Sequence, residues 1–195
     1  MPQFIVDGEE LIQKPVKKHG GGAIVYVPKA WVDEDVAIIR KPLTSPEAIQ
    51  QIIKSKPSTT VYSYFVLDIV NKGHIIQMQN AKAAAGPNGI SIVGIVGEKA
   101  VVKQKGKKPI LTIDERIDLA RSIRYNDFVV LQDEYSPINN ITKMEPNIMM
   151  ESASHSKEMI QQVKDTVRTW GGKVIVTPYY SPTSSTKIKN KIRRG

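Results

Sequence analysis

The segment from Phe65 to Lys82 holds the residues best suited to bind a phosphate group. An apolar, strand-like run is interrupted at Asp68, and Gly73 and His74 stand where a helical pattern begins. The first amides of a helix have no partner within the helix, and the helix dipole adds partial positive charge, so a helix start favours an anion. Gly73 would let the backbone come close to that anion, and His74 could donate a hydrogen bond to it. A plain surface loop is the alternative that this stretch alone leaves open.

Positive charge gathers in the later part of the chain. The 195 residues carry a formal net charge of +9, yet residues 1–56 hold 8 lysines and arginines against 7 acidic residues, so nearly all of the excess lies beyond residue 56. Two basic clusters contribute much of it: Lys99, Lys103, Lys105, Lys107 and Lys108, and Lys187, Lys189, Lys191, Arg193 and Arg194. Each cluster either forms a solvated face or attracts the phosphates of a nucleotide or a nucleic acid.

Composition excludes several other kinds of chemistry. The chain has no cysteine, which rules out disulfides and thiolate chemistry. His19, His74 and His155 are scattered, and no pair has the spacing of metal ligands, so we expect no metal site built from side chains. The sequence contains no run of about 18 apolar residues, and its acidic N-terminus lacks the core of a signal peptide. We therefore expect a cytoplasmic protein that does not associate with a membrane.

From residue 59 onward, strand-like runs alternate with helical stretches. The expected strands are Thr59–Val66, Ser91–Val96, Asp127–Leu131, Asn147–Met150 and Lys173–Thr177. The expected helices are Gly73–Ala85, Ile113–Arg124, Pro137–Lys143, Ser156–Trp170 and Ser185–Arg194. This alternation predicts βαβ units and a doubly wound parallel sheet of five strands. Because such sheets bind ligands at the carboxyl ends of their strands, the segment around His74 should lie at the binding crevice.

Local signals explain where some helices begin and end. Thr112 and Glu115 have the spacing of a capping box. Ser136 before Pro137 predicts an N-cap followed by a first-turn proline. The glycine pair 171–172 can supply the left-handed residue that ends the helix before it.

The chain before residue 59 predicts a separate organisation. Residues 1–40 form a small β-rich module, with strands at Ala23–Pro28 and Val36–Arg40 after a turn of three glycines. Residues 41–58 form a proline-containing linker with a short helix, for which Ser45 is the N-cap and Pro46 the first residue. Residues 59–195 form the main domain.

Three motifs in the main domain occur in an order and spacing that resemble one enzyme family. "DIVNKGH" (Asp68–His74) resembles the (His/Thr)-x-Gly-His motif of the nucleotidyltransferases, in the form that cytidylyltransferases use. "KGKKPILTIDERIDLARSIRYNDFVVL" (Lys105–Leu131) resembles that family's basic loop, its Glu-Arg helix start and the strand that follows. "PYYSPTSSTKIKNKI" (Pro178–Ile192) resembles its C-terminal serine-threonine segment. The resemblance implies a Rossmann-like nucleotidyltransferase fold.

The resemblance also implies a reaction. A phosphorylated alcohol or sugar would attack the α-phosphorus of CTP, which is favoured, or of ATP, and pyrophosphate would leave. Mg²⁺ would accompany the nucleotide phosphates. The attacking phosphate is already anionic, so catalysis would consist of positioning and charge stabilisation without a strong general base.

The family's functional residues map onto named positions of this chain. The resemblance implies catalytic roles for His74, Lys105, Lys107 and Arg124. It implies nucleotide binding by Asn71, Gly73, His74, Ser184, Ser185 and Thr186. Asp68 would order the loop between the strand and the helix.

Several positions depart from the family pattern. Asn71 replaces the first motif histidine, and asparagine can donate a hydrogen bond but cannot act as an acid. Phe65 replaces a glycine, and Tyr179 stands in a region where some members carry an arginine. "ESASHS" (Glu151–Ser156) replaces a segment rich in glycine and aspartate. These departures leave open an alternative function, a degenerate nucleotide-binding regulator with a DNA-binding N-terminal module.

The N-terminal module has a resemblance of its own. "VKKHGGGAIVYVPKAWVDEDVAIIR" (Val16–Arg40) resembles the AbrB-like swapped-hairpin pattern, in which the hairpins of two chains interleave. That resemblance implies a homodimer, and unpaired edge strands in so small a module favour such pairing. Lys17, Lys18 and Lys29 could contact DNA phosphates. The nearly neutral charge of residues 1–56 favours dimerisation over nucleic-acid binding.

Overall fold

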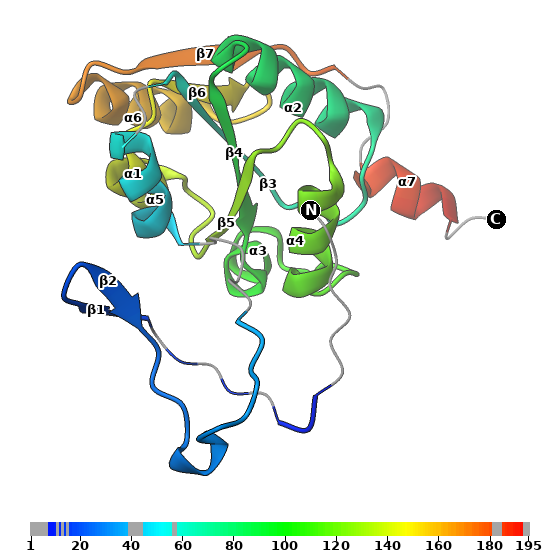
Figure 1. Ribbon diagram of the computed structural model, residues 1–195. Helices are drawn as coiled ribbons and strands as arrows, with labels where there is room; N and C mark the ends of the chain where they lie inside the picture. Colours follow the sequence, from blue (N-terminus) through cyan, green and yellow to red (C-terminus); the bar gives the residue numbers. More distant parts are fainter. Residues whose placement is uncertain are drawn as a thin grey trace. The chain divides into compact units, whose positions relative to one another are not determined.

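The chain divides into two compact units, Met1–Pro42 and Leu43–Gly195. A computed structural model describes residues 8–10, 12, 14, 16–38, 45–55, 58–180 and 185–192 (Figure 1). No helix within these ranges is long and apolar enough to cross a membrane.

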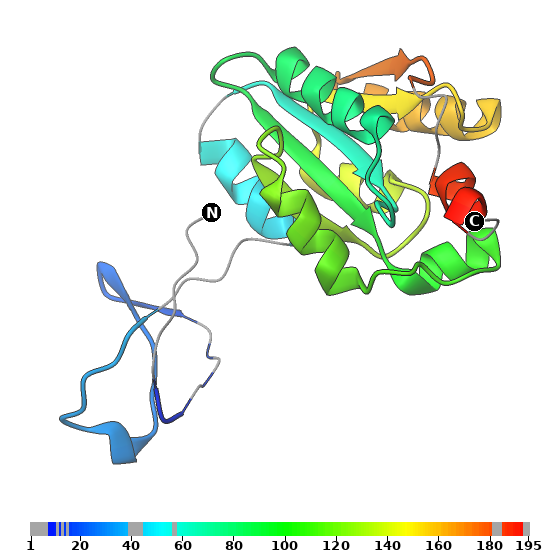
Figure 2. The ribbon, with the colours of Figure 1, turned by 90° about the vertical axis from the view of Figure 1, so that its right-hand side faces the viewer.

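Five parallel strands form the centre of the larger unit (Figures 1 and 2). They are β3 (Thr60–Phe65), β4 (Ile90–Val96), β5 (Phe128–Gln132), β6 (Ile148–Ser152) and β7 (Lys173–Thr177). Their order in the sheet is β5-β4-β3-β6-β7, so the chain starts in the middle, winds to one edge and then crosses to the other. The expected doubly wound parallel sheet is confirmed, and each strand lies within two residues of its predicted bounds.

Seven helices of the described residues belong to this unit. They are α1 (Pro46–Ser55), α2 (Lys72–Ala85), α3 (Glu98–Lys105), α4 (Ile113–Ser122), α5 (Ile138–Met144), α6 (Lys157–Arg168) and α7 (Ser185–Ile192). Buried side chains of α2 and α4 pack on one face of the sheet. Those of α1, α3, α5 and α6 pack on the other face. The ribbon shows helices on both sides of the sheet (Figure 2). Helices therefore cover both faces of the sheet, as its strands require because they carry apolar side chains on both sides.

Helix α3 was not predicted from the sequence. Only Ala100 and Val101 of this helix are buried, and its lysines face solvent, so the apolar stripe is too narrow to show as a helical pattern. The helix ends at Gly106, which adopts the left-handed conformation that favours glycine. The first basic cluster is thus partly helix and partly the segment that follows it.

Most of the predicted helix ends are present. Thr112 and Glu115 form the expected capping box, and Gly171 has the expected positive φ of 77°. Helix α5 begins one residue later than predicted, because Pro137 is its N-cap. Ser136 still contributes, since its Oγ accepts a hydrogen bond from the Ile138 amide at 3.4 Å.

Helix α1 packs against the larger unit, although the sequence placed it in a linker. The side chain of Ile49 is fully buried in the core, and Glu47 pairs with Lys143 of α5 at 3.0 Å. Ser45 caps the helix as expected, because its Oγ accepts a hydrogen bond from the Ala48 amide at 3.2 Å. A truncation that preserves the fold must therefore begin before α1.

The N-terminal unit is a short hairpin without buried residues among those described. Strands β1 (Lys17–His19) and β2 (Gly22–Ile24) pair antiparallel, and a 3-10 turn, η1 (Lys29–Trp31), follows. The predicted strand Ala23–Pro28 is reduced to β2, and residues 36–38 form no strand, while 39–40 lie outside the described residues. Among its described residues, the large apolar side chains that are exposed are Val16, Tyr26, Val27, Val32, Val36 and Ile38.

Candidate active site

An open cavity of about 1000 Å³ lies along the carboxyl ends of the central strands. Most of its lining comes from the ends of β3, β4, β6 and β7 and the segments that follow them, together with α7, and Tyr135 after β5 adds to it. Strands β3 and β6 are neighbours in the sheet, and the chain winds away from them in opposite directions. This is the switch point at which open α/β sheets bind ligands. The segment around His74 lies at the crevice, as the sequence predicted.

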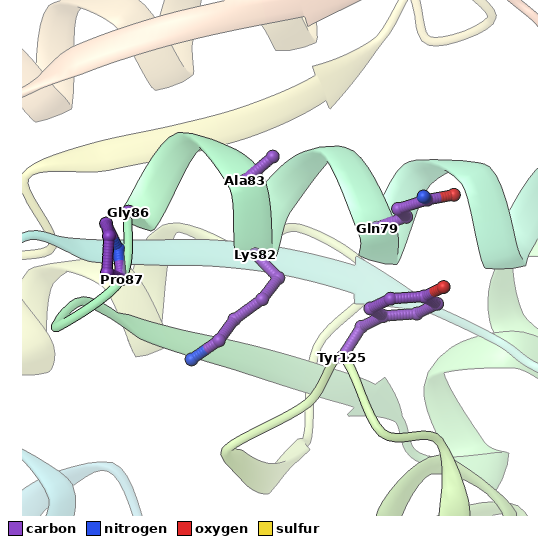
Figure 3. Close-up of a pocket in the computed structure, with 6 residues that line it drawn as sticks. All are labelled: Gln79, Lys82, Ala83, Gly86, Pro87 and Tyr125. Atoms are coloured by element: carbon purple, nitrogen blue, oxygen red, sulfur yellow. The ribbon is translucent and has the colours of Figure 1, made fainter.

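A second, smaller hollow of about 400 Å³ lies at the other end of α2 (Figure 3). Its lining residues are Gln79, Lys82, Ala83, Gly86, Pro87 and Tyr125. The ammonium of Lys82 already pairs with Asp127 at 2.6 Å and donates to the Gly89 carbonyl at 3.0 Å. This hollow therefore offers a ligand little free charge, and the larger cavity is the candidate site.

The start of α2 is fixed by a reciprocal pair of hydrogen bonds. Asn71 is the N-cap, and its Oδ1 accepts a hydrogen bond from the Gly73 amide at 3.0 Å. Nδ1 of His74 accepts one from the Asn71 amide at 3.3 Å. Because Nδ1 accepts, the proton of the neutral imidazole must be on Nε2. His74 lines the cavity, so its Nε2–H is a donor available to a ligand there.

The surroundings keep the His74 imidazole neutral. Burial and the nearby positive charge of Lys105 lower the pKa of His74 to about 4. The ring of Phe65 lies edge-on to the imidazole, with ring centroids 5.5 Å apart. At neutral pH His74 is therefore a neutral hydrogen-bond donor held in a fixed orientation.

Asp68 joins three segments that border the cavity. Its Oδ1 accepts hydrogen bonds from the amides of Ile110 at 2.6 Å and Leu111 at 3.0 Å. Its Oδ2 pairs with the ammonium of Lys189 on α7. Burial alone would raise the pKa of Asp68, but the bonds from Lys189 and the two amides outweigh it and lower the pKa. The carboxylate thus ties the β3–α2 loop to the segment before α4 and to α7.

Arg116 was missed by the sequence analysis as a functional residue, and it supports the same edge of the sheet. Its buried guanidinium donates to the carbonyls of Val66 at 2.8 Å and Val96 at 2.6 Å, just where β3 and β4 end. It also donates to the carbonyl of Leu111 at 3.3 Å. The only sequence signal was the Glu-Arg pair at the start of α4, which gave no reason to expect full burial.

The predicted basic residues lie in two different places. Lys105 and Lys107 line the cavity, and the Lys105 ammonium stands 5.7 Å from the centre of the Tyr135 ring. Arg124 is exposed and donates to the Tyr125 hydroxyl at 2.9 Å. It precedes β5, so it lies at the amino end of the sheet and is not among the residues that line the cavity.

The start of α7 docks on the loop before α2. Ser185 lines the cavity, and its Oγ donates to the Ile69 carbonyl at 2.9 Å. Ser184 lies outside the described residues, as does the side chain of Thr186. Asn71, Gly73, His74 and Ser185 therefore line one cavity, and their role in nucleotide binding stays a prediction.

The segment after β6 brings a second group of titratable side chains to the cavity. Glu151 is fully buried, and its Oε2 lies 2.5 Å from Nδ1 of His155. The hydroxyl of Tyr64 lies 3.1 Å from the same nitrogen. The sequence shows this segment only as a departure from the family pattern, because 87 residues separate Tyr64 from Glu151.

The parallel doubly wound sheet with a polar crevice at its switch point defines a class of open α/β proteins that bind ligands at this edge of the sheet. The profile of the cytidylyltransferase-like family matches residues 66–191. The chain therefore belongs to the cytidylyltransferase-like family, a family of nucleotidyltransferases, which confirms the resemblance of the main domain. The match begins at residue 66, so the AbrB-like resemblance of the N-terminal module stays a prediction.

Curated relatives share limited identity with the chain. It is 27% identical to "Bifunctional protein HldE" of Geotalea uraniireducens strain Rf4 over 176 aligned residues. The aligned stretch covers 90% of this chain and 35% of that protein. It is 28% identical over 150 residues to the protein of the same name from Trichlorobacter lovleyi, covering 75% and 30%. The chain thus spans about a third of the length of these relatives.

Two solved structures share the fold. A lipopolysaccharide core biosynthesis protein from Thermoplasma volcanium has a TM-score of 0.54 at 17% identity, over 65% of this chain and 99% of that one. A pantoate-beta-alanine ligase from Francisella tularensis has a TM-score of 0.51 at 16% identity, over 78% and 77%. At these identities the likeness shows the fold alone.

Proposed function

We propose that the chain transfers a nucleotidyl group from a nucleoside triphosphate to a phosphorylated alcohol or sugar. CMP is the favoured group and AMP the alternative. The observation that carries the proposal is the Nε2–H of His74 at the start of α2, facing a cavity that lysines also line. A helix start with a fixed donor and nearby ammonium groups suits a triphosphate.

The proposed chemistry is an in-line displacement at the α-phosphorus. An oxygen of the acceptor phosphate forms the new P–O bond, and the bond to the leaving pyrophosphate breaks with its electron pair on the pyrophosphate oxygen. His74 donates to a phosphate oxygen through Nε2, and Lys105 and Lys107 offset the negative charge that develops. An anionic nucleophile needs no strong base, so positioning and electrostatic stabilisation carry the catalysis.

Mg²⁺ would reach the site with the nucleotide. The family typically uses this ion, which when bound neutralises charge on the phosphates. Within the described ranges no group of three or more histidine, aspartate or glutamate residues could hold a metal ion. The carboxylates of Asp68 and Glu151 are engaged by Lys189 and His155. The residues present therefore fit an ion held by the phosphates better than one held by the protein.

A nucleotide-binding regulator is the second candidate function. Two observations favour it: the Asn71 side chain caps α2 instead of facing a ligand freely, and Arg124 lies away from the cavity. Such a protein would bind a triphosphate without releasing pyrophosphate. Its N-terminal unit would bind DNA selectively, whereas the transferase proposal predicts only weak, salt-sensitive binding.

We also propose that the N-terminal unit joins two copies of the chain. Six of its described apolar side chains are 42–77% exposed, and its strands β1 and β2 have three residues each. A two-stranded hairpin of this size is marginal on its own. Pairing with the same unit of a second chain would cover both the apolar side chains and the strand edges.

Pyrophosphate release tests the proposed function directly. The full chain is incubated with each nucleoside triphosphate and a panel of phosphorylated alcohols and sugars, with Mg²⁺ present. Release that depends on both a triphosphate and an acceptor supports the transferase. Tight triphosphate binding without release from any pair supports the regulator, and absence of binding refutes both.

A further inference from the structure

A buried polar network at the end of β5 takes no direct part in the proposed chemistry. It joins Tyr62 of β3, Gln132 of β5 and Asn140 of α5, which are at most 5% exposed. The Tyr62 hydroxyl donates to Oε1 of Gln132 at 2.7 Å and accepts a hydrogen bond from Nδ2 of Asn140 at 3.0 Å. Burial raises the pKa of Tyr62, so its hydroxyl keeps the proton that it donates. The three side chains thus satisfy one another inside the core, where an unpaired polar group would be costly.

Gln132 connects this network to the backbone that follows β5. Its Nε2 donates to the carbonyls of Glu134 at 3.0 Å and Tyr135 at 3.2 Å. Gly94 leaves room for the arrangement, because a Cβ at this position would lie 2.0 Å from the Tyr62 hydroxyl and 2.9 Å from Oε1 of Gln132. The backbone that carries the Tyr135 ring is therefore anchored to the core.

Tyr135 lines the cavity beside a lysine. The Lys105 ammonium lies 5.7 Å from the centre of the Tyr135 ring, within the range of a cation–π interaction. The ring is partly buried against the core, whereas Lys105 is exposed at the C-terminal end of α3. Because a lysine side chain rotates about several bonds, contact with an anchored ring restricts the positions that its ammonium can occupy.

Two other lysines of the cavity pair with carboxylates. Lys108 lies 3.0 Å from Oε1 of Glu98, and Lys189 pairs with Asp68. A carboxylate offsets the charge of the ammonium that it contacts, whereas an aromatic ring carries no net charge. The contact with Tyr135 therefore restrains Lys105 and leaves its positive charge available to an anion in the cavity.

The order of the strands brings this pair toward His74. Strands β5, β4 and β3 are neighbours in that order. Tyr135 follows β5, Lys105 ends the helix after β4, and His74 lies in the first turn of the helix after β3. The charge of Lys105 acts on the imidazole, since it contributes to the lowered pKa of His74. An anion that accepts a hydrogen bond from Nε2 of His74 would therefore meet the field of the same ammonium.

We propose that Tyr135 is a positioning residue of the site: its ring holds the Lys105 ammonium on the side of His74, so that both residues donate to the phosphates of one bound triphosphate. The ammonium has three N–H donors, so it can keep one side against the ring and donate to a phosphate from another. Gln132 supports the ring through the backbone, and Lys105 touches the ligand. This inference rests on the proposed function, because it assumes that the phosphates bind at His74.

Titration of His74 by NMR tests the positioning in the full chain without any ligand. Lys105→Met removes the charge and should raise the pKa of His74. Tyr135→Leu should raise it part of the way, because the ammonium then spends less time near the imidazole. Tyr135→Phe keeps the ring and should match the wild type, and Tyr135→Leu should add nothing in the Lys105→Met background. Lys99→Met, an exposed change on α3 outside the lining of the cavity, is the matched control.

Calorimetry with inorganic tripolyphosphate tests the consequence for binding. Tyr135→Leu should weaken binding roughly two- to fivefold, the range that follows from the loss of one exposed cation–π contact. Tyr135→Phe should bind as the wild type does. Lys99→Met should also match the wild type at about 0.15 M salt, where charges that lie far from the ligand are screened.

The two measurements separate failure of this inference from failure of the proposed function. An unchanged pKa of His74 in Tyr135→Leu would overturn the inference. A rise that persists in the Lys105→Met background would do so too, because the ring would then act by shielding the imidazole from water. Tighter tripolyphosphate binding by Tyr135→Leu would show that the ring withholds the ammonium from the ligand, contrary to the inference. A wild-type chain that binds neither tripolyphosphate nor a nucleotide would refute the proposed function, while the titrations still decide whether the ring positions Lys105.

Discussion

Replacing Asp68 by asparagine should loosen the edge of the sheet that carries the site. Asparagine keeps one oxygen, so the amides of Ile110 and Leu111 can retain their bonds to Oδ1. The new side-chain NH₂ group would face the Lys189 ammonium, where the wild type has a carboxylate oxygen. Both groups are hydrogen-bond donors, so the bond between residues 68 and 189 would be lost. Because the Lys189 side chain is 24% exposed, its ammonium can turn to water, which limits the loss.

The magnitude follows from these contacts. A hydrogen bond to a charged group contributes about 1.5–3 kcal/mol, and the two amide bonds weaken once the acceptor is neutral, so we expect a loss of about 2–3 kcal/mol in the free energy of unfolding. Lys189→Met should cost less, since the buried carboxylate keeps both amides. The double variant should lose less than the sum of the two single changes, by about 1–2 kcal/mol.

Urea unfolding followed by tryptophan fluorescence measures this loss. The chain has two tryptophans, and Trp31→Phe leaves Trp170, whose Nε1 donates to the Pro146 carbonyl at 3.0 Å, as the reporter of the larger unit. Since the pKa of Asp68 is lowered in the folded state, its contribution is complete above its unfolded pKa of about 4 and is lost as the pH falls further. The difference between wild type and Asp68→Asn should be constant from about pH 5 to 8 and shrink below about pH 4. Equal stabilities at neutral pH, or a difference that acid does not reduce, would refute this reasoning.

Three further predictions concern the imidazole, the core and the N-terminal unit. The NMR shifts of His74 in the free protein should stay those of a neutral imidazole down to about pH 5, and a titration midpoint near 6.5 would contradict its burial beside Lys105. Gly94→Ala should lower the free energy of unfolding by about 3 kcal/mol in urea, because its Cβ would lie 2.0 Å from the Tyr62 hydroxyl; wild-type stability would contradict the packing. In sedimentation, the full chain should run as a dimer and residues 43–195 as a monomer, and the same state for both would refute dimerisation through the N-terminal unit.

The sheet and most helix ends could be predicted from the sequence because their signals are local. A strand that is apolar on both faces shows as a short apolar run, and a capping box such as Thr112–Glu115 needs only residues three apart. Helix α3 gave no such signal, because it buries only two residues and its lysines are exposed. The packing of α1 on the core was not predicted either, because only Ile49 of this helix is fully buried and Ile53 is partly buried beside it.

The candidate site was only partly predictable, because some of its residues carry a local signal and others make contact only in the folded chain. Gly73 and His74 carry a local strand–glycine–helix signal, and the structure places both at the cavity. The acceptor role of His74 Nδ1 depends on the backbone of Asn71 and so needs the folded helix start. The full burial of Arg116 and the contact of Tyr64 with Glu151 arise only when strands distant in sequence become neighbours. The family motif placed Arg124 with the site, whereas the sheet direction places it at the opposite end.

The central claim is that Nε2–H of His74 stabilises the transferring phosphates. Two variants separate this role from helix capping: His74→Asn keeps an acceptor for the Asn71 amide but loses the distal donor, while His74→Gln restores an N–H group near the position of Nε2. His19→Ala, an exposed change in the N-terminal unit, is the control.

Single-turnover pyrophosphate release, with the triphosphate and acceptor that the wild type prefers, is the decisive measurement. We expect His74→Asn to be slower by roughly 10²–10³-fold, His74→Gln to recover part of that rate, and His19→Ala to match the wild type. A His74→Asn variant that releases pyrophosphate as fast as the wild type would contradict the claim.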